Sequence, residues 1–230
     1  MLEKKFIKSQ SWSDYETRWL ENYDAANYGT SLSGRVLAST HRIIENDPKL
    51  AARYDSVLEV GVGTMAHFPT VRHDFSRYVA SDHDPKVIRF LEEREWDPRI
   101  EVRQLSGDQL PFDDCSFDRL IATHVLEHVR DPVSALEEWV RVVRPGGVIS
   151  LILPCDPGFA WRFGRMLGPR KKATEAGLPY DYYMAVEHVN AIFGLRSIIQ
   201  YHFPDRKERW WPLAVPVPDI NLIYGVNCYI

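Results

Sequence analysis

Cysteine is scarce in this sequence, and no long hydrophobic run occurs in it. The three cysteines, Cys115, Cys155 and Cys228, are far apart and odd in number, which argues against a disulfide framework and favours a reducing compartment. No uncharged run is long enough to cross a bilayer, and the N-terminal residues contain no continuous apolar stretch. These absences predict a cytoplasmic protein with no transmembrane segment.

A strong net charge is also absent. The formal net charge of the 230 residues is -4, so the chain as a whole does not attract polyanions and a nucleic-acid partner is not expected. Internal repeats and low-complexity segments are missing as well. A hydrophobic fraction of 45% is typical of a globular protein with one core, and we expect a single domain.

Between Ser56 and Leu153, short β-branched runs alternate with helical patterns, which is typical of βαβ units and a parallel sheet. Asp84-Pro85 and Asp131-Pro132 each combine a capping carboxylate with a proline suited to the first helical position, so both predict the start of a helix. The predicted strands cover residues 56–60, 77–81, 100–105, 117–123 and 147–153.

We expect three regions within the domain. They are a helical cap or lid over residues 1–50, a cofactor-binding core over 51–155, and an acceptor-pocket insertion with C-terminal strands over 156–230. In the first region, aromatic residues at helical spacing mark one face of an amphipathic helix. These residues are Trp12, Tyr15, Trp19 and Tyr23. Core packing and a lid hinged near Tyr28 both remain open as interpretations of this face.

A glycine-rich turn follows the first predicted strand. Gly61 and Gly63 allow the backbone to turn tightly and to approach a ligand closely. Asp82 ends the second predicted strand, where its carboxylate could accept hydrogen bonds from both hydroxyls of a ribose. The string Gly61 to Ala66 also satisfies the G-x-G-x-x-A fingerprint of dinucleotide sites, so a nicotinamide or flavin enzyme is an alternative at this point.

Further motifs separate these alternatives. They are the segments 107–112 (GDQLPF), 116–118 (SFD) and 124–129 (HVLEHV). With them the chain resembles the class I S-adenosylmethionine-dependent methyltransferase superfamily, in the subgroup that modifies small molecules, quinones and sugars. The resemblance implies a Rossmann-like, doubly wound α/β fold. Its seven-stranded sheet would be mostly parallel with an antiparallel last strand and helices on both faces, and the final strands would fall within residues 197–204 and 220–230.

The resemblance also assigns residues to S-adenosyl-L-methionine. Glu59 would position the methionine part of the cofactor, and the loop of Gly61 and Gly63 would pass beneath the ribose and methionine portions. Asp82 would take the ribose, and His83 would flank the adenine.

On the adenine side, Asp108 would accept a hydrogen bond from the amino group, with Gln109 and Leu110 beside it, while His124 would lie near the sulfonium end. The chain departs from the family pattern at Met65, where a third glycine is usual. We expect a wider turn and different packing of the methionine end without loss of binding, because a backbone that avoids positive φ there tolerates a side chain.

Methyl transfer from a sulfonium is an in-line displacement, so the residues near the acceptor mainly align it and manage its proton. His124, Glu127 and His128 would share one face if their segment were helical, and His188 follows later in the chain. Three interpretations stay open. Glu127 and His128 brace a turn, or His128 or His188 is a base oriented by Glu127, or the group binds a divalent metal. Its many nitrogen ligands would suit zinc, manganese or iron.

Two segments, 161–172 and 206–211, interleave basic and aromatic residues, and Tyr180, Tyr182 and Tyr183 add further rings. Such segments can hold phosphorylated sugars, lipid headgroups or RNA, or they form a solvated face. The predicted function is therefore methyl transfer to an O or N atom of a small molecule, such as a sugar, nucleotide sugar or polysaccharide intermediate. The alternatives are an RNA methyltransferase, a nicotinamide-dependent oxidoreductase and a non-catalytic cofactor-binding module.

Overall fold

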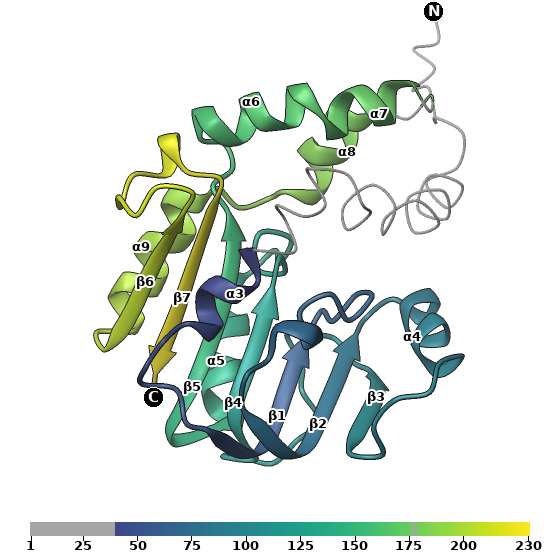
Figure 1. Cartoon of the computed structure of the whole chain (residues 1–230), viewed down its shortest axis with the longest axis vertical. Helices are drawn as coiled ribbons and strands as arrows, with labels where there is room; N and C mark the ends of the chain where they lie inside the picture. Colours follow the sequence, from purple (N-terminus) through teal and green to yellow (C-terminus); the bar gives the residue numbers. More distant parts are fainter. Residues whose placement is uncertain (1–39, 176, 178) are drawn as a thin grey trace, which may run out of the picture.

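A seven-stranded sheet with the strand order β3-β2-β1-β4-β5-β7-β6 forms the centre of the molecule (Figure 1). The computed structural model describes residues 40–175, 177 and 179–230, so the predicted aromatic helix and its hinge at Tyr28 lie outside the described residues. The strands are β1 (Arg53–Val60), β2 (Asp74–Asp82), β3 (Ile100–Gln104), β4 (Phe117–Thr123), β5 (Val143–Pro154), β6 (Arg206–Trp211) and β7 (Ile223–Tyr229).

All neighbouring strands from β3 to β5 are parallel, whereas β7 runs antiparallel to both β5 and β6. The predicted fold class is confirmed. β1 lies between β2 and β4, so the order in which the chain adds strands reverses there. Ligands of such sheets bind beyond the carboxyl ends of the strands at this reversal point.

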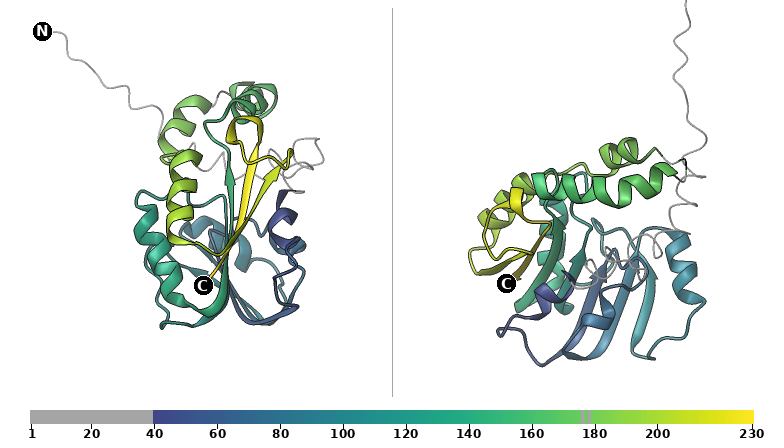
Figure 2. Two further views of the ribbon diagram at one scale, coloured as in Figure 1. Left: turned by 90° about the vertical axis from the view of Figure 1, so that its left-hand side faces the viewer. Right: turned by 45° about the horizontal axis from the view of Figure 1, so that its top comes forward.

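Helices cover both faces of the sheet (Figure 2). The helices α5 (Pro132–Val142) and α9 (Ile192–His202) pack into one hydrophobic core, while α3 (Arg42–Glu45) and α4 (Pro85–Glu92) pack into the other. β4 is buried along its whole length because it is covered on both sides. As predicted, the side chains of Asp84 and Asp131 cap α4 and α5, accepting hydrogen bonds from Lys86 N and Ser134 N at 2.7 and 3.1 Å.

The prediction of a strand over residues 197–204 is wrong, because this segment belongs to α9. Leu195, Ile199 and Phe203 are buried at helical spacing against the sheet, and this packing outweighs the β-branched pair that suggested a strand. The adjoining strand is instead β6, an edge strand whose charged residues are typical of unpaired edges. The strand predicted within 220–230 is confirmed as β7.

The connection from β1 to β2 contains no α-helix, only the 3-10 turn η1 (Phe68–Thr70). Within it, Gly61, Gly63 and Met65 all have positive φ, of 66°, 52° and 65°. The expectation that Met65 avoids positive φ is therefore wrong. A left-handed residue costs about 1–2 kcal/mol, and burying a methionine side chain contributes roughly 1.5–3 kcal/mol. The Met65 side chain is buried among α4, β1 and β2 residues, so its burial offsets the strain.

Three further helices, α6 (Phe159–Leu167), α7 (Pro169–Glu175) and α8 (Tyr180–Glu187), lie beyond the carboxyl ends of the strands (Figure 1). They follow β5 and precede α9, within the region predicted to receive the acceptor. In the part of the chain that the structure describes, no helix is long and apolar enough to span a membrane.

Candidate active site

The loops after β1 and β2 meet at the carboxyl edge of the sheet. Gly63 N donates a hydrogen bond to Asp82 Oδ2 at 3.0 Å, and Asp84 N donates to Asp82 Oδ1 at the same distance. Burial alone would raise the pKa of Asp82, but the hydrogen bonds from His83 and from these two amides outweigh it and lower that pKa. Asp82 is therefore an anchored, ionised carboxylate at neutral pH.

Both glycines of this turn are required, for different reasons. A Cβ on Gly61 would collide with the side chain of Val125 in the loop after β4, so Gly61 lets the two loops come together. A Cβ on Gly63 would meet no atom within 4 Å. The open space beside Gly63 and the carboxylate of Asp82 fit a ribose and the chain attached to it.

The residues predicted to flank the adenine come from the loops after β2 and β3. Asp108 is exposed and accepts a hydrogen bond from Ser106 Oγ. Leu110 is buried, and its backbone N donates to Glu138 Oε1 at 2.8 Å. Leu105 N donates to Asp82 O at 2.9 Å, which fixes this loop next to Asp82.

Glu59 lies deeper than the other predicted cofactor residues. Its side chain is fully buried in β1 and accepts a hydrogen bond from Tyr78 Oη, while Oε1 has no partner among the described residues. Burial raises the pKa of Glu59. A contact between Glu59 and the methionine part of the cofactor stays a prediction.

A buried polar network lies near the same carboxyl edge of the sheet, and the sequence analysis did not predict it. Arg119, in the middle of β4, donates to both carboxylate oxygens of Glu45 at 2.6 and 3.1 Å, and all of these side-chain atoms are fully buried. His67 Nε2 lies 3.1 Å from Glu45 Oε1, and His41 Nδ1 lies 3.3 Å from His67 Nδ1. The ring of His41 reaches within 5.9 Å of the His124 ring. The available signal was an arginine in a strand that the flanking apolar residues predict to be buried.

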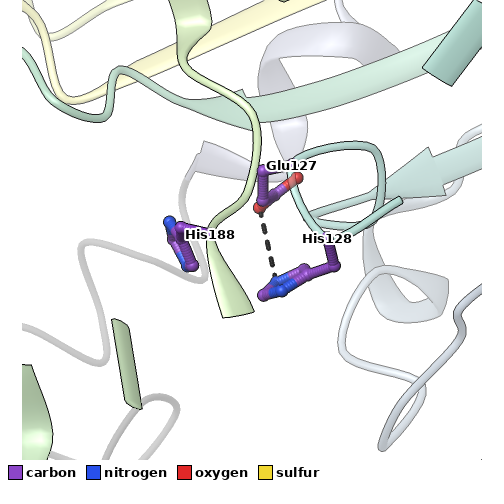
Figure 3. A group of neighbouring side chains, drawn as sticks. All are labelled: Glu127, His128 and His188. Atoms are coloured by element: carbon purple, nitrogen blue, oxygen red, sulfur yellow. Dashed lines mark ion pairs between the residues drawn. The ribbon is translucent and has the colours of Figure 1, made fainter. Parts of the chain in front are cut away.

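The acceptor-side cluster is brought together by a turn rather than by the helix that was considered. His124 has φ 58°, and its Nδ1 lies 3.6 Å from Glu127 Oε1. Glu127 Oε1 is also 4.0 Å from His128 Nε2 (Figure 3), and the rings of His128 and His188 meet edge to face at 4.9 Å. Glu127 Oε2 is buried and has no partner in the described part of the chain. The four predicted residues are therefore neighbours.

Asp156 is the residue of this site that the sequence interpretation missed. It lies two residues after the end of β5 and is buried, and its Oδ2 lies 2.8 Å from His188 Nδ1 and 3.2 Å from Arg165 Nη1. Glu127 was the predicted orienting carboxylate, yet it faces His124 and His128 instead. Burial would raise the pKa of Asp156, but His188 and Arg165 outweigh it and lower that pKa. The His188–Asp156 pair is an oriented imidazole with its carboxylate.

Glu127, His128 and His188 could also hold a metal ion, since one ligand atom from each lies within 4.8 Å of the others. Ligand atoms bound at about 2.0–2.2 Å from one ion lie roughly 3–3.5 Å apart. The side chains would therefore have to close by more than 1 Å in places. As they stand, both Nδ1 atoms have other partners, Glu187 O for His128 at 3.0 Å and Asp156 for His188.

The turn after β1 also bears on the nicotinamide alternative. A dinucleotide fingerprint works because its glycines open a helix whose N-terminus receives the pyrophosphate. Residues 61–73 are all described and contain no α-helix. The site therefore suits a nucleoside cofactor without a pyrophosphate.

The chain matches the family of methyltransferase domains over residues 58–151. It is 35% identical over 191 residues to an uncharacterized methyltransferase of Mycobacteroides abscessus, covering 73% of this chain and 72% of that protein. It is 34% identical over 108 residues to the phosphatidylethanolamine N-methyltransferase of Cereibacter sphaeroides, covering 44% of this chain and only 51%, about half, of that relative.

A similar solved structure is the N-methyltransferase NodS of Bradyrhizobium japonicum, in complex with S-adenosylhomocysteine. The TM-score is 0.58 at 14% identity, over 94% of this chain and 97% of that one. Together with the sheet order and the site, these matches show that the chain belongs to the class I S-adenosylmethionine-dependent methyltransferases. Its cofactor is S-adenosyl-L-methionine, as predicted.

Proposed function

We propose that the protein transfers a methyl group to an oxygen or nitrogen atom of a small molecule that carries an anionic or sugar-like group. The observation that carries this proposal is the His188–Asp156 pair, with 2.8 Å between Nδ1 and Oδ2, beside the loop after β4. A paired imidazole is suited to remove a proton from a hydroxyl or amine near neutral pH. The partial match to an enzyme named for N-methylation of a phospholipid also supports a small-molecule acceptor.

In the proposed reaction, bound S-adenosylmethionine supplies an electrophilic methyl group, and S-adenosylhomocysteine is the leaving group. Asp156 accepts the Nδ1 proton of His188, so the lone pair of His188 is on Nε2. Nε2 takes the proton that the acceptor atom loses as its new bond to carbon forms. The imidazolium is stabilised by Asp156 until it returns the proton to water.

His128 and Glu127 are proposed to position the acceptor. His128 Nδ1 donates to Glu187 O at 3.0 Å, which leaves its Nε2 as an acceptor on the side of Glu127. Partial burial lowers the pKa of His128, and Glu127 keeps a lowered pKa despite its burial because His124 and His128 lie beside it. A neutral imidazole and an ionised carboxylate can both accept hydrogen bonds from the acceptor.

The cofactor contacts are proposed from the same geometry. Asp82 accepts hydrogen bonds from the ribose hydroxyls, and His83 and Leu110 flank the adenine. Asp108 accepts from the adenine amino group, and His124 lies near the sulfonium. Gln109, Gly61, Gly63 and Glu59 complete the proposed set.

Acceptor class and proton transfer can be tested together. We would incubate the protein with methyl-labelled S-adenosylmethionine and, separately, nucleotide sugars, phosphatidylethanolamine vesicles, demethylmenaquinone and bulk RNA. Label in one of the small molecules is expected, and label only in RNA would establish the RNA methyltransferase instead. With the labelled acceptor, His188→Ala should lower kcat roughly 10²- to 10⁴-fold, since this is the usual contribution of a general base.

The controls separate chemistry from folding. Asp156→Asn should lower kcat in the same direction, whereas both variants should bind S-adenosylhomocysteine with the affinity of the parent. His202→Ala removes an exposed histidine at the end of α9 and should leave kcat unchanged. Parental kcat in His188→Ala would refute the proposed base.

We also propose a cytoplasmic location. Cys155 and Cys228 are buried free thiols and Cys115 is an exposed one. A free exposed thiol stays reduced in that compartment.

A further inference from the structure

The helix α6 exposes an apolar stripe. Phe159, Phe163, Met166 and Leu167 are 72, 51, 59 and 68% exposed, and their spacing places them along one side of the helix. The rings of Phe159 and Phe163 stack with 6.3 Å between centroids. None of the nine residues of α6 is buried. A helix that packs only against its own protein would turn such a stripe inward.

The apolar stripe continues into the neighbouring loop between β6 and β7. Phe159 N approaches Asp219 Oδ1 at 3.4 Å, and α6 contacts the 3-10 turn η2 (Pro218–Ile220) of this loop. Figure 1 shows the loop beside the start of α6. Its exposed apolar residues are Leu213, Val215, Val217 and Ile220. We call α6 and this loop the exposed apolar face.

Basic side chains flank the stripe. Residues 159–175 contain five arginines and lysines and one glutamate, in a chain whose net charge is -4. Arg170 is paired with Asp181 at 2.6 Å, and Lys171 with Glu175 at 3.9 Å. Arg162 is exposed on α6 itself. The segment therefore keeps an excess of positive charge around an apolar centre.

An apolar stripe surrounded by positive charge indicates which kind of partner could bind the exposed apolar face. A second copy docked through the same face would bring the two positive segments together, which disfavours self-association. An anionic membrane surface provides negative headgroups for the basic side chains and acyl chains for the stripe. Nine residues are too few to span a bilayer but enough to lie in its surface.

The same helix touches the proposed acceptor site. Arg165, one residue before Met166, contacts Asp156, which holds His188. Arg165 projects from the face of α6 roughly opposite the stripe, so a surface against the stripe would lie about one helix diameter, roughly 10 Å, from the site. A headgroup extending past α6 would have to cover that distance to reach the imidazole.

We propose that the exposed apolar face docks on a bilayer containing anionic lipids, and that the methyl acceptor is a lipid of this bilayer whose polar headgroup reaches His188. The docking stands on the exposure and charge of α6, whereas the assignment of the acceptor rests on the proposed function. Phospholipids and lipid-linked sugars share the required chemistry, a phosphate-bearing polar headgroup on an acyl or prenyl anchor.

The docking is tested by co-sedimentation of the full chain with vesicles. Vesicles of phosphatidylcholine mixed with phosphatidylglycerol should bind the protein, and vesicles of phosphatidylcholine alone should bind it at least about tenfold more weakly. The double variant Phe163→Ser, Met166→Ser should lose at least about tenfold in partition to the mixed vesicles, because it removes half of the stripe. Arg162→Glu should lose affinity only for the mixed vesicles.

Matched measurements keep the outcome interpretable. Tyr201→Ser removes an aromatic ring that is 84% exposed on α9 and should bind vesicles like the parent. Every variant should bind S-adenosylhomocysteine with parental affinity, which reports intact folding and cofactor binding. Equal sedimentation of parent and double variant would overturn the docking, as would a parental dimer that dissociates in the double variant.

The acceptor is tested separately by methyl transfer to phosphatidylethanolamine and to lipid-linked sugars in the mixed vesicles. Label in a lipid, reduced at least about tenfold by the stripe variant and retained in Tyr201→Ser, would support the assignment. Transfer to water-soluble nucleotide sugars at equal rates in parent and stripe variant would refute it. That result would leave the proposed function standing.

Discussion

The cofactor end of the site is anchored from inside the sheet, whereas the acceptor end is attached to a helix with no buried residue. At the edge formed by β1, β2 and β4, backbone amides hold Asp82. At the same edge, His67 contacts the buried ion pair of Glu45 and Arg119. On the other side, α6 contacts the site through the ion pair of Arg165 with Asp156, and none of the residues of this helix is buried. We infer that the rigid carboxyl edge of the sheet receives one fixed cofactor, and that the exposed helix α6 adapts the site to its acceptor.

The largest expected effect contrasts a buried with an exposed ion pair. Arg119→Met leaves Glu45 as a buried carboxylate without its cation, and we expect unfolding to become easier by about 3–5 kcal/mol. Arg170→Met breaks the exposed pair with Asp181 and should change stability by less than about 1 kcal/mol. Urea denaturation of both variants measures the difference. Similar losses in both would remove the contrast between the two ends of the site.

A second pair of variants compares the aspartates at the two ends of β2. In the proposed site, Asp82→Ala removes two charge-assisted hydrogen bonds to the ribose, each worth about 1.5–3 kcal/mol, so affinity for S-adenosylhomocysteine should fall at least about 100-fold. Asp74→Ala alters an exposed aspartate at the start of the same strand, where it pairs with Arg53 and Arg99. Calorimetry should find parental affinity in that variant. Parental affinity in Asp82→Ala would exclude Asp82 from the cofactor site.

A smaller effect is expected from pH. Burial, together with the charges of His124 and His67, lowers the pKa of His41 to about 2. The unfolded chain, with a His pKa near 6.5, therefore binds a proton between these values that the folded protein rejects. The contribution of His41 to the free energy of unfolding should therefore fall as the pH drops through this window, by about 2 kcal/mol between pH 7 and pH 5.

The measurement is urea denaturation at both pH values. His41→Gln should lose about half of the slope between them, because His73, whose pKa is lowered to about 4, contributes a similar share over the same interval. An unchanged slope in His41→Gln would assign the acid sensitivity to other groups.

The sequence predicted the parallel strands of the sheet, the glycine-rich turn after the first strand and the position of Asp82 at the end of the second, because these follow from local patterns. Strand alternation, the caps at Asp84 and Asp131, and the glycines at 61 and 63 are each encoded within a few residues. The strand over 197–204 was misassigned because Ile198 and Ile199 favour strands locally, while burial on one side of a helix decides the outcome.

The pairing of His188 with Asp156 could not be predicted, because the two residues are 32 positions apart and join only when α8 packs beyond β5. Likewise, the positive φ of Met65 depends on a buried space formed by α4 and the sheet. Long-range packing, rather than local propensity, decides both features.

The position of α3 has a consequence for how the chain folds. Although α3 precedes β1, it is fastened to the last strand: Asn227 Nδ2 donates to Ile44 O at 2.9 Å, and Tyr229 Oη donates to Asp47 Oδ2 at 2.8 Å, 182 positions away. A contact of such high sequence separation closes a very long loop and forms slowly. We expect α3 to become protected from amide exchange only after β7 has inserted beside β5, so a helix that is synthesised before β1 is secured only when the last strand of the sheet is in place.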